Sequence, residues 1–152
     1  MQEYPEQTDC AWLAVDSIGH VGVFITAGVG PIPETVLKSE LPIVEIESAL
    51  LELAPLGPAS LAVRIPSPES FIALAKRGLF VYDWQNAHRI GAERKPGYDL
   101  VASPARPIDI MEMPSKLTGI AAKVALATHS FSQEERIDIA SALPCMCSNE
   151  MR

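Results

Sequence analysis

The sequence predicts a single α+β domain, an antiparallel or mixed sheet with helices packed on one face. Its 152 residues suffice for one compact domain (1–152), and no Gly/Ser-rich linker or change in composition divides them. Segments with strand character arrive mostly as hairpins, with helical segments interspersed. Thirteen scattered prolines separate the elements and do not form a low-complexity tract. Residues 1–9 and 145–152 are expected to be flexible termini.

A β-hairpin opens the predicted fold. Residues 11–15 and 21–25 are apolar and rich in β-branched and aromatic side chains. Between them, Asp16 and Gly19 are residue types that suit a tight turn. The alternation of side chains along a strand predicts these core positions: Trp12, Ala14, Val21 or Val23, and Ile25. Residues 27–33 are then expected to form a loop, because they contain two glycines and two prolines.

Two helices are predicted in the middle of the chain. The first covers residues 43–53 and displays acidic side chains opposite its apolar face. That face consists of residues at helical spacing: Ile43, Ile46, Leu50 and Leu53. The second helix covers residues 67–77, because Ser67 is a good N-cap and Gly78 a good C-terminal stop.

Short strands are predicted around the second helix. Residues 61–65 form one before it, and residues 79–84 form a buried strand after it. Residues 98–102 are expected to pair with this strand across the polar stretch 85–96. Residues 108–111 are expected to add another short strand.

The last third of the chain carries weaker signals. The apolar residues of segment 117–124 fit a helix, but they also fit an alternating strand; the helix is favoured. Residues 132–143 are predicted to be helical, because Ser132 and Glu135 form a capping-box pattern and Pro144 ends the segment.

Charge supplies the main functional signal. The net charge is −7, yet residues 1–55 hold nine carboxylates against one lysine, a net charge of −8. This balance disfavours binding to nucleic acid or to an anionic membrane surface. An ordinary solvated acidic surface is the simpler explanation; the functional interpretation is an acidic face that attracts a protein partner with a basic surface. The candidate contact residues are Glu34, Glu40, Glu45, Glu47 and Glu52.

A small-molecule or phosphate-ester site is the alternative. Loop 28–33, with Gly28 and Gly30, follows a strand as phosphate-binding loops do. It lacks the third glycine of a dinucleotide fingerprint, so a rigid structural corner is the simpler interpretation. A ligand site would require this loop to meet other polar residues in space: His20, Asp83, His88 and Arg89.

Residues for catalysis, metal binding or cofactor binding do not stand out. There is no Gly-x-Ser-x-Gly or Ser-x-x-Lys motif, and Cys10 has no flanking base. The three histidines are far apart in sequence, and the pair Cys145 and Cys147 lacks a second ligand pair, so no metal site is predicted. Three sparse cysteines and an acidic, polar start are typical of a cytoplasmic protein, and the chain is expected not to be an enzyme.

One resemblance adds to this interpretation. The segments Asp16-Ser-Ile-Gly-His-Val-Gly-Val-Phe24 and Gly28-Val-Gly-Pro-Ile-Pro33 form a D-x-x-G-H-V-x-V-F…G-x-G-P-x-P pattern. With Gly78-Leu-Phe-Val-Tyr-Asp-Trp84, this pattern resembles a group of small, uncharacterised bacterial cytosolic proteins. The resemblance implies an immunity or interaction protein at least as readily as an enzyme, and no functional residue carries over from it. The resulting hypothesis is a non-catalytic acidic interaction protein, such as an immunity-type inhibitor of a basic toxin domain; an oligomer-building role is a further alternative.

Overall fold

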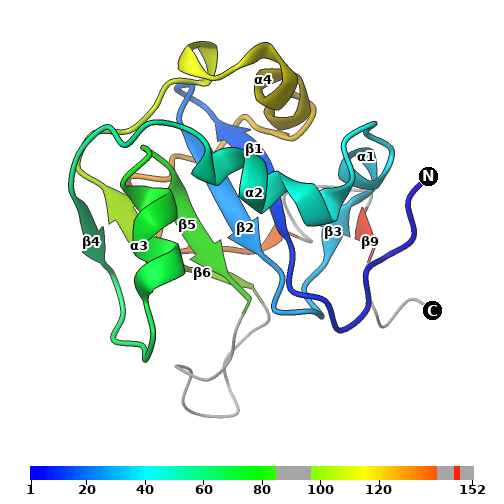
Figure 1. Ribbon diagram of the computed structural model, residues 1–152, viewed down its shortest axis with the longest axis horizontal. Helices are drawn as coiled ribbons and strands as arrows, with labels where there is room; N and C mark the ends of the chain where they lie inside the picture. The colour runs from blue at the N-terminus through cyan, green and yellow to red at the C-terminus, as the bar shows by residue number, and fades with distance from the viewer. Residues whose placement is uncertain (85–96, 140–145, 148–152) are drawn as a thin grey trace.

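The computed structural model describes residues 1–84, 97–139 and 146–147 (Figure 1). A mixed sheet forms the centre of the domain, with strand order β4-β6-β5-β2-β1-β7 and with β8 paired to β6. β1 and β2 are antiparallel, whereas β2 and β5 run parallel to each other. The strands of this sheet are β1 (Ala11–Asp16), β2 (Val21–Ile25), β4 (Ala59–Leu61), β5 (Phe80–Asp83), β6 (Tyr98–Pro104), β7 (Ala125–Leu126) and β8 (Arg136–Ile137).

Short helices accompany this sheet. The α-helices are α1 (Glu34–Leu37), α2 (Ile46–Leu51), α3 (Glu69–Ala75) and α4 (Ser115–Ala122), and the 3-10 turns are η1 (Ile43–Glu45) and η2 (Ile110–Glu112). α2 and α3 lie on one face of the sheet, and α4 packs beside strand β1 (Figure 1). A separate two-stranded sheet joins β3 (Ile32–Pro33) to β9 (Met146–Cys147). The predicted α+β class, with a mixed sheet and packed helices, is confirmed.

The two faces of the sheet bury different side chains. On one face, Phe24 stacks between Trp12 and Tyr82, with ring centroids 4.4 and 5.0 Å apart respectively. Phe131, from the C-terminal segment, covers this face and lies 5.9 Å from the ring of Phe24. Alternation places Leu13 on the opposite face, which α2 and α3 cover. Because both faces are covered, the hairpin strands are buried almost throughout, and alternation alone selects too few core positions.

The predicted hairpin, both central helices and the strands near residues 79–84 and 98–102 are all present. Two other strand predictions are wrong. Residues 61–65 do not form a strand; β4 covers Ala59–Leu61, where it pairs with β6. The segment 108–111 leads into η2, because the Asp109 carboxylate accepts the N–H of Met111 and caps a 3-10 turn. Only a single bridge between Asp109 and His20 remains of the expected pairing.

The last third differs most from expectation. The helix favoured for 117–124 is confirmed as far as Ala122, where α4 ends, and β7 begins only at Ala125, beyond that segment. The predicted helix 132–143 is wrong in its first half. The Glu134 side chain bonds to the backbone N–H of Ser130, and β8 pairs with β6 instead of continuing a helix. The remainder of the prediction, from residue 140, lies outside the described residues.

Residues 1–9, expected to be flexible, pack against the domain. The Gln2 side chain bonds to the backbone of Ser39, Leu41 and Ile43, and Tyr4 is buried. Of the segment 145–152, the structure describes only β9. In the described part of the chain, no helix has the length and apolar character needed to span a membrane.

Candidate functional site

A groove of about 700 Å³ lies between the α1–η1 connection and α4. Leu41 and Ile120 form apolar parts of its lining. One wall comes from residues 38–45 and the other from α4, so the groove joins segments that are more than seventy positions apart in sequence. Its full lining is Lys38, Ser39, Glu40, Leu41, Pro42, Glu45, Lys116, Gly119, Ile120 and Lys123.

The first wall is held in place by polar contacts. The side-chain amide of Gln2 donates to the carbonyls of Ser39 and Leu41, at 3.0 and 3.1 Å. Its oxygen accepts the N–H of Ile43 at 2.9 Å. The connection between α1 and η1 therefore has a defined backbone course although it contains little regular structure.

The second wall is one face of α4. Lys116, Gly119, Ile120 and Lys123 recur at helical spacing, so they share one side of the helix. Leu117 and Ala121 are buried beneath it. This arrangement presents two lysine side chains and an exposed glycine to the groove.

The groove separates charge between its walls. Glu40 and Glu45 are exposed on the first wall, and Lys116 and Lys123 are exposed on the second. In the described part of the chain, none of these four forms an ion pair within 4.0 Å. Lys38 differs, because its ammonium lies 3.0 Å from the carboxylate of Glu34. The four unpaired groups are available to a ligand that carries both signs of charge.

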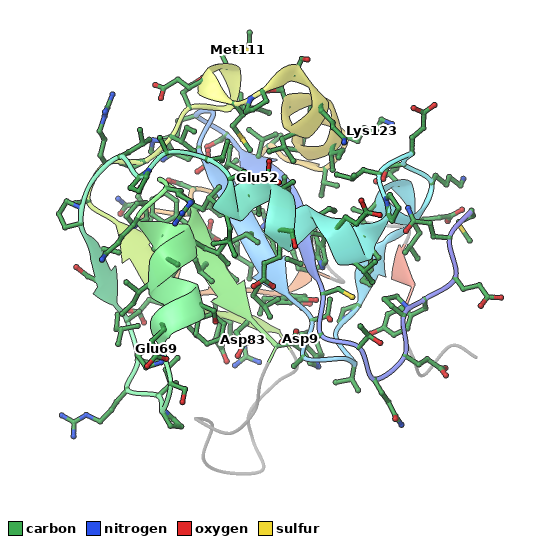
Figure 2. The ribbon with its side chains drawn as sticks, viewed as in Figure 1. Asp9, Glu52, Glu69, Asp83, Met111 and Lys123 are labelled. Carbon is green, nitrogen blue, oxygen red and sulfur yellow. The ribbon has the colours of Figure 1, made fainter. Side chains whose placement is uncertain are left out.

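The five candidate acids do not form one continuous surface. Glu45 and Glu52 are seven positions apart along η1 and α2, which places them on the same flank. Figure 2 shows Glu52 on the side of α2 that is turned toward α4. Glu47 lies on the other flank, where its pKa is raised by burial and by the nearby charge of Asp9. Glu34 is partly neutralised by Lys38.

The flank that holds Glu47 also explains the chemistry of Cys10. This thiol is buried, and burial together with the charges of Asp9 and Glu47 raises its pKa to about 11. A thiol with so high a pKa stays protonated at neutral pH, and it is the thiolate that acts as a nucleophile. Burial and the neighbouring acids therefore disfavour the thiolate form of Cys10.

The backbone N–H groups around Gly28 and Gly30 donate hydrogen bonds to other groups of the chain. The N–H groups of Val29 and Gly30 donate to the carbonyl of Thr26, and that of Gly28 donates to the Thr26 hydroxyl. The N–H of Ala27 donates to Asp9. Because an anion-binding loop must point free N–H groups at its ligand, this loop as folded does not provide such a cradle.

Close packing accounts for Gly30 as well. A Cβ at this position would lie 2.6 Å from the hydroxyl of Tyr98 and 2.9 Å from the ring of Trp84. The loop is therefore the rigid corner that the simpler interpretation describes.

No family model, no curated protein and no solved structure matches this chain.

Of the other residues of the alternative ligand site, the structure places Asp83 near the glycine loop and His20 far from it. Asp83 is buried and pairs in register with Ile25, at the glycine-loop end of β2. His20 directly precedes β2 at its opposite end. At a rise of about 3.3 Å per residue, it lies about 16 Å from Ile25. His88 and Arg89 lie outside the described residues.

The fold brings His129 next to the hairpin turn that contains His20, although the two residues are far apart in sequence. The His129 carbonyl accepts the N–H of Ser17, next to the turn that contains His20. His129 Nδ1 lies 2.8 Å from Glu134 Oε1, whereas His20 Nδ1 lies 4.0 Å from Asp16 Oδ2. Within the described ranges, no group of three or more His, Cys, Asp and Glu side chains is placed to hold a metal ion.

Sequence reasoning missed Lys116, Gly119 and Lys123. Their helical spacing is visible in the sequence, but it does not show that α4 faces the segment 38–45. That relationship is tertiary, so only the charged residues of the first wall could be named in advance.

Proposed function

We propose that the chain is a non-catalytic interaction protein, and that it binds a partner with a basic surface through the acidic residues of the first groove wall and the adjacent flank of η1 and α2. The contact acids are Glu40, Glu45 and Glu52. The observation that carries the proposal is the pair of exposed carboxylates, Glu40 and Glu45, which line a groove without an ion-pair partner in the described part of the chain.

The surroundings of these carboxylates support the proposal. Val44, next to Glu45 in η1, is 56% exposed, which is unusual for a valine. Specific interfaces combine an apolar centre with a polar rim. The apolar lining of the groove, the exposed valine next to Glu45 and the carboxylates of Glu40 and Glu45 supply both parts.

Charge is expected to act mainly on the rate of association and on the choice of partner. Rim charge pairs each contribute only about 0.2–1 kcal/mol, and salt screens them. Their larger effect is to steer a basic surface into the encounter and to disfavour acidic surfaces. An immunity-type inhibitor, which masks the basic surface of a toxin domain, is one class of protein that works in this way.

Affinity capture tests the proposal. The chain is immobilised and exposed to an extract of the cells that produce it, beside the variant E40Q/E45Q/E52Q. The variant E3Q/E69Q/E135Q is the control, since it removes three exposed carboxylates from other elements and changes the net charge equally.

The proposal predicts one basic protein retained in stoichiometric amount by the wild type and by the control. The first variant should bind that protein about tenfold more weakly, the combined effect of three rim charges. If both triple variants retained the partner equally, the proposal would be contradicted. The net charge of the protein, and not the location of the three carboxylates, would then determine binding.

A further inference from the structure

Gly119 is a glycine that the free chain does not require. It lies in the interior of α4, on the exposed face that lines the groove. Beyond its chain neighbours and the adjacent backbone of α4, a Cβ built on it would meet no atom of the described residues within 4 Å, and its φ is not positive. By contrast, Gly30 has close neighbours that exclude a side chain.

A glycine in a helix interior destabilises the protein by roughly 0.5–1 kcal/mol relative to alanine. Such a glycine is useful where another backbone must approach closely. None of the described residues approaches Gly119 closely, so the space above it is open to a bound molecule.

The position of Gly119 indicates the direction of this approach. It lies between Lys116 and Lys123, which are seven residues or about 10 Å apart along the helix axis. An extended peptide covers that distance in about three residues. The missing side chain therefore opens a gap in the α4 wall, with a cation on each side of it.

We propose that the groove seats an extended peptide segment of the partner, whose backbone crosses α4 at Gly119. A basic side chain of this segment points to Glu40 and Glu45, and an adjacent acidic side chain points to Lys116 and Lys123. Neighbouring residues of an extended chain point in opposite directions, so a basic residue followed by an acidic one matches the two walls. This inference rests on the proposed function and names the part of the partner that enters the groove.

Blocked peptides provide a direct probe. The ¹⁵N-labelled protein is titrated with acetyl-Gly-Arg-Asp-Gly-amide up to millimolar concentration, and amide shifts are recorded. The single-sign peptides acetyl-Gly-Arg-Arg-Gly-amide and acetyl-Gly-Asp-Asp-Gly-amide are the matched controls. We expect the mixed peptide to bind about fivefold more tightly than either control, since each control leaves one wall unpaired.

The shifts should be confined to residues 38–45 and 116–123. Equal binding of the three peptides, shifts centred elsewhere, or no shifts at millimolar concentration would each overturn the inference.

Gly119→Ala tests the close approach itself. Its added methyl group should weaken the mixed peptide at least fivefold while the free protein becomes more stable. Gly57→Ala is the matched control, because a Cβ there has ordinary room, with its nearest neighbour 3.7 Å away, and Gly57 is not part of the groove. Unchanged peptide affinity in Gly119→Ala would overturn the role of this glycine.

The two proposals fail in different ways. If capture of the basic partner depends on Glu40, Glu45 and Glu52 but the peptides do not bind, the peptide inference is wrong and the proposed function stands. If the mixed peptide binds in the groove but capture is unaffected by E40Q/E45Q/E52Q, the proposed function is wrong and the groove is a peptide site of another kind.

Discussion

The carboxylate of Asp16 accepts the backbone N–H of Phe131 at 2.9 Å, which joins the first hairpin to a segment 115 positions later. Its other oxygen accepts the N–H groups of Ile18 and His20 within the hairpin turn. One buried side chain therefore shapes the turn and positions the aromatic ring that covers the sheet.

Asp16→Ala is expected to lower the free energy of unfolding by about 2–4 kcal/mol. Three backbone donors lose a charged acceptor, and the loss at the buried N–H of Phe131 is the most costly. Urea denaturation of this variant beside Asp9→Ala measures the effect, because Asp9 accepts only one exposed backbone N–H. Equal losses in the two variants would contradict the joining role of Asp16.

Phe131→Ala is expected to destabilise the protein by about 3–5 kcal/mol, the cost of emptying a fully buried aromatic site. Its ring contacts those of Phe24, Phe80 and Tyr82. Phe71 on α3 is only partly buried, so Phe71→Ala should cost clearly less. Thermal and urea unfolding of both variants provides the comparison; a smaller loss at Phe131 would show that this face of the sheet is not sealed by the C-terminal segment.

The same chemical change should have opposite effects at two glycines. Gly30→Ala should lower the free energy of unfolding by about 1–3 kcal/mol, because its Cβ would overlap the Tyr98 hydroxyl. Gly119→Ala should raise it by roughly 0.5–1 kcal/mol, because the new methyl group meets open space in a helix. Denaturation midpoints of the two variants test the contrast, and a destabilised Gly119→Ala would mean that this glycine has a structural role.

Glu47 and Asp9 should make the stability of the protein depend on pH. Burial, and then the charge of Asp9, raises the pKa of Glu47; burial likewise raises the pKa of Asp9, and its bond from Ala27 opposes this rise. A folded-state pKa above the unfolded value means that the folded protein holds the proton more tightly. The two carboxyl groups therefore make their full contribution to the free energy of unfolding at low pH. This contribution is lost as the pH rises from about 4 through the raised pKa values.

Glu47→Gln removes one of these ionisations. The variant should be more stable than the wild type at pH 7 and should lose this advantage near pH 3, where the wild-type carboxyl is protonated. Glu45→Gln, on the other flank, is the control. An advantage that does not change with pH would indicate a packing effect instead of an electrostatic one.

Local signals account for the parts of the fold that could be predicted. The hairpin has a turn with Asp16 and Gly19 between two apolar strands, and the turn that follows α3 contains Gly78, whose φ of +94° favours glycine. Residues 132–137 show the limit of such signals. Their capping pattern is local, but pairing of β8 with β6 and the side-chain bond from Glu134 to Ser130 determine the structure.

The candidate site was predictable only in part, for a related reason. Charge distribution identifies Glu40 and Glu45 as candidate contacts, but it does not separate them from Glu47, which faces another flank. The significance of Gly119 depends on the empty space around it, and no sequence pattern reports that space.

Hydrogen exchange on the complex with the captured basic partner shows whether that partner occupies the groove. We expect slower exchange at backbone amides of residues 38–45 and 116–123, with little change at the hairpin turn 16–20 or along the edge strand β4. Protection centred on the turn or on β4, with unchanged exchange in the groove, would contradict this expectation.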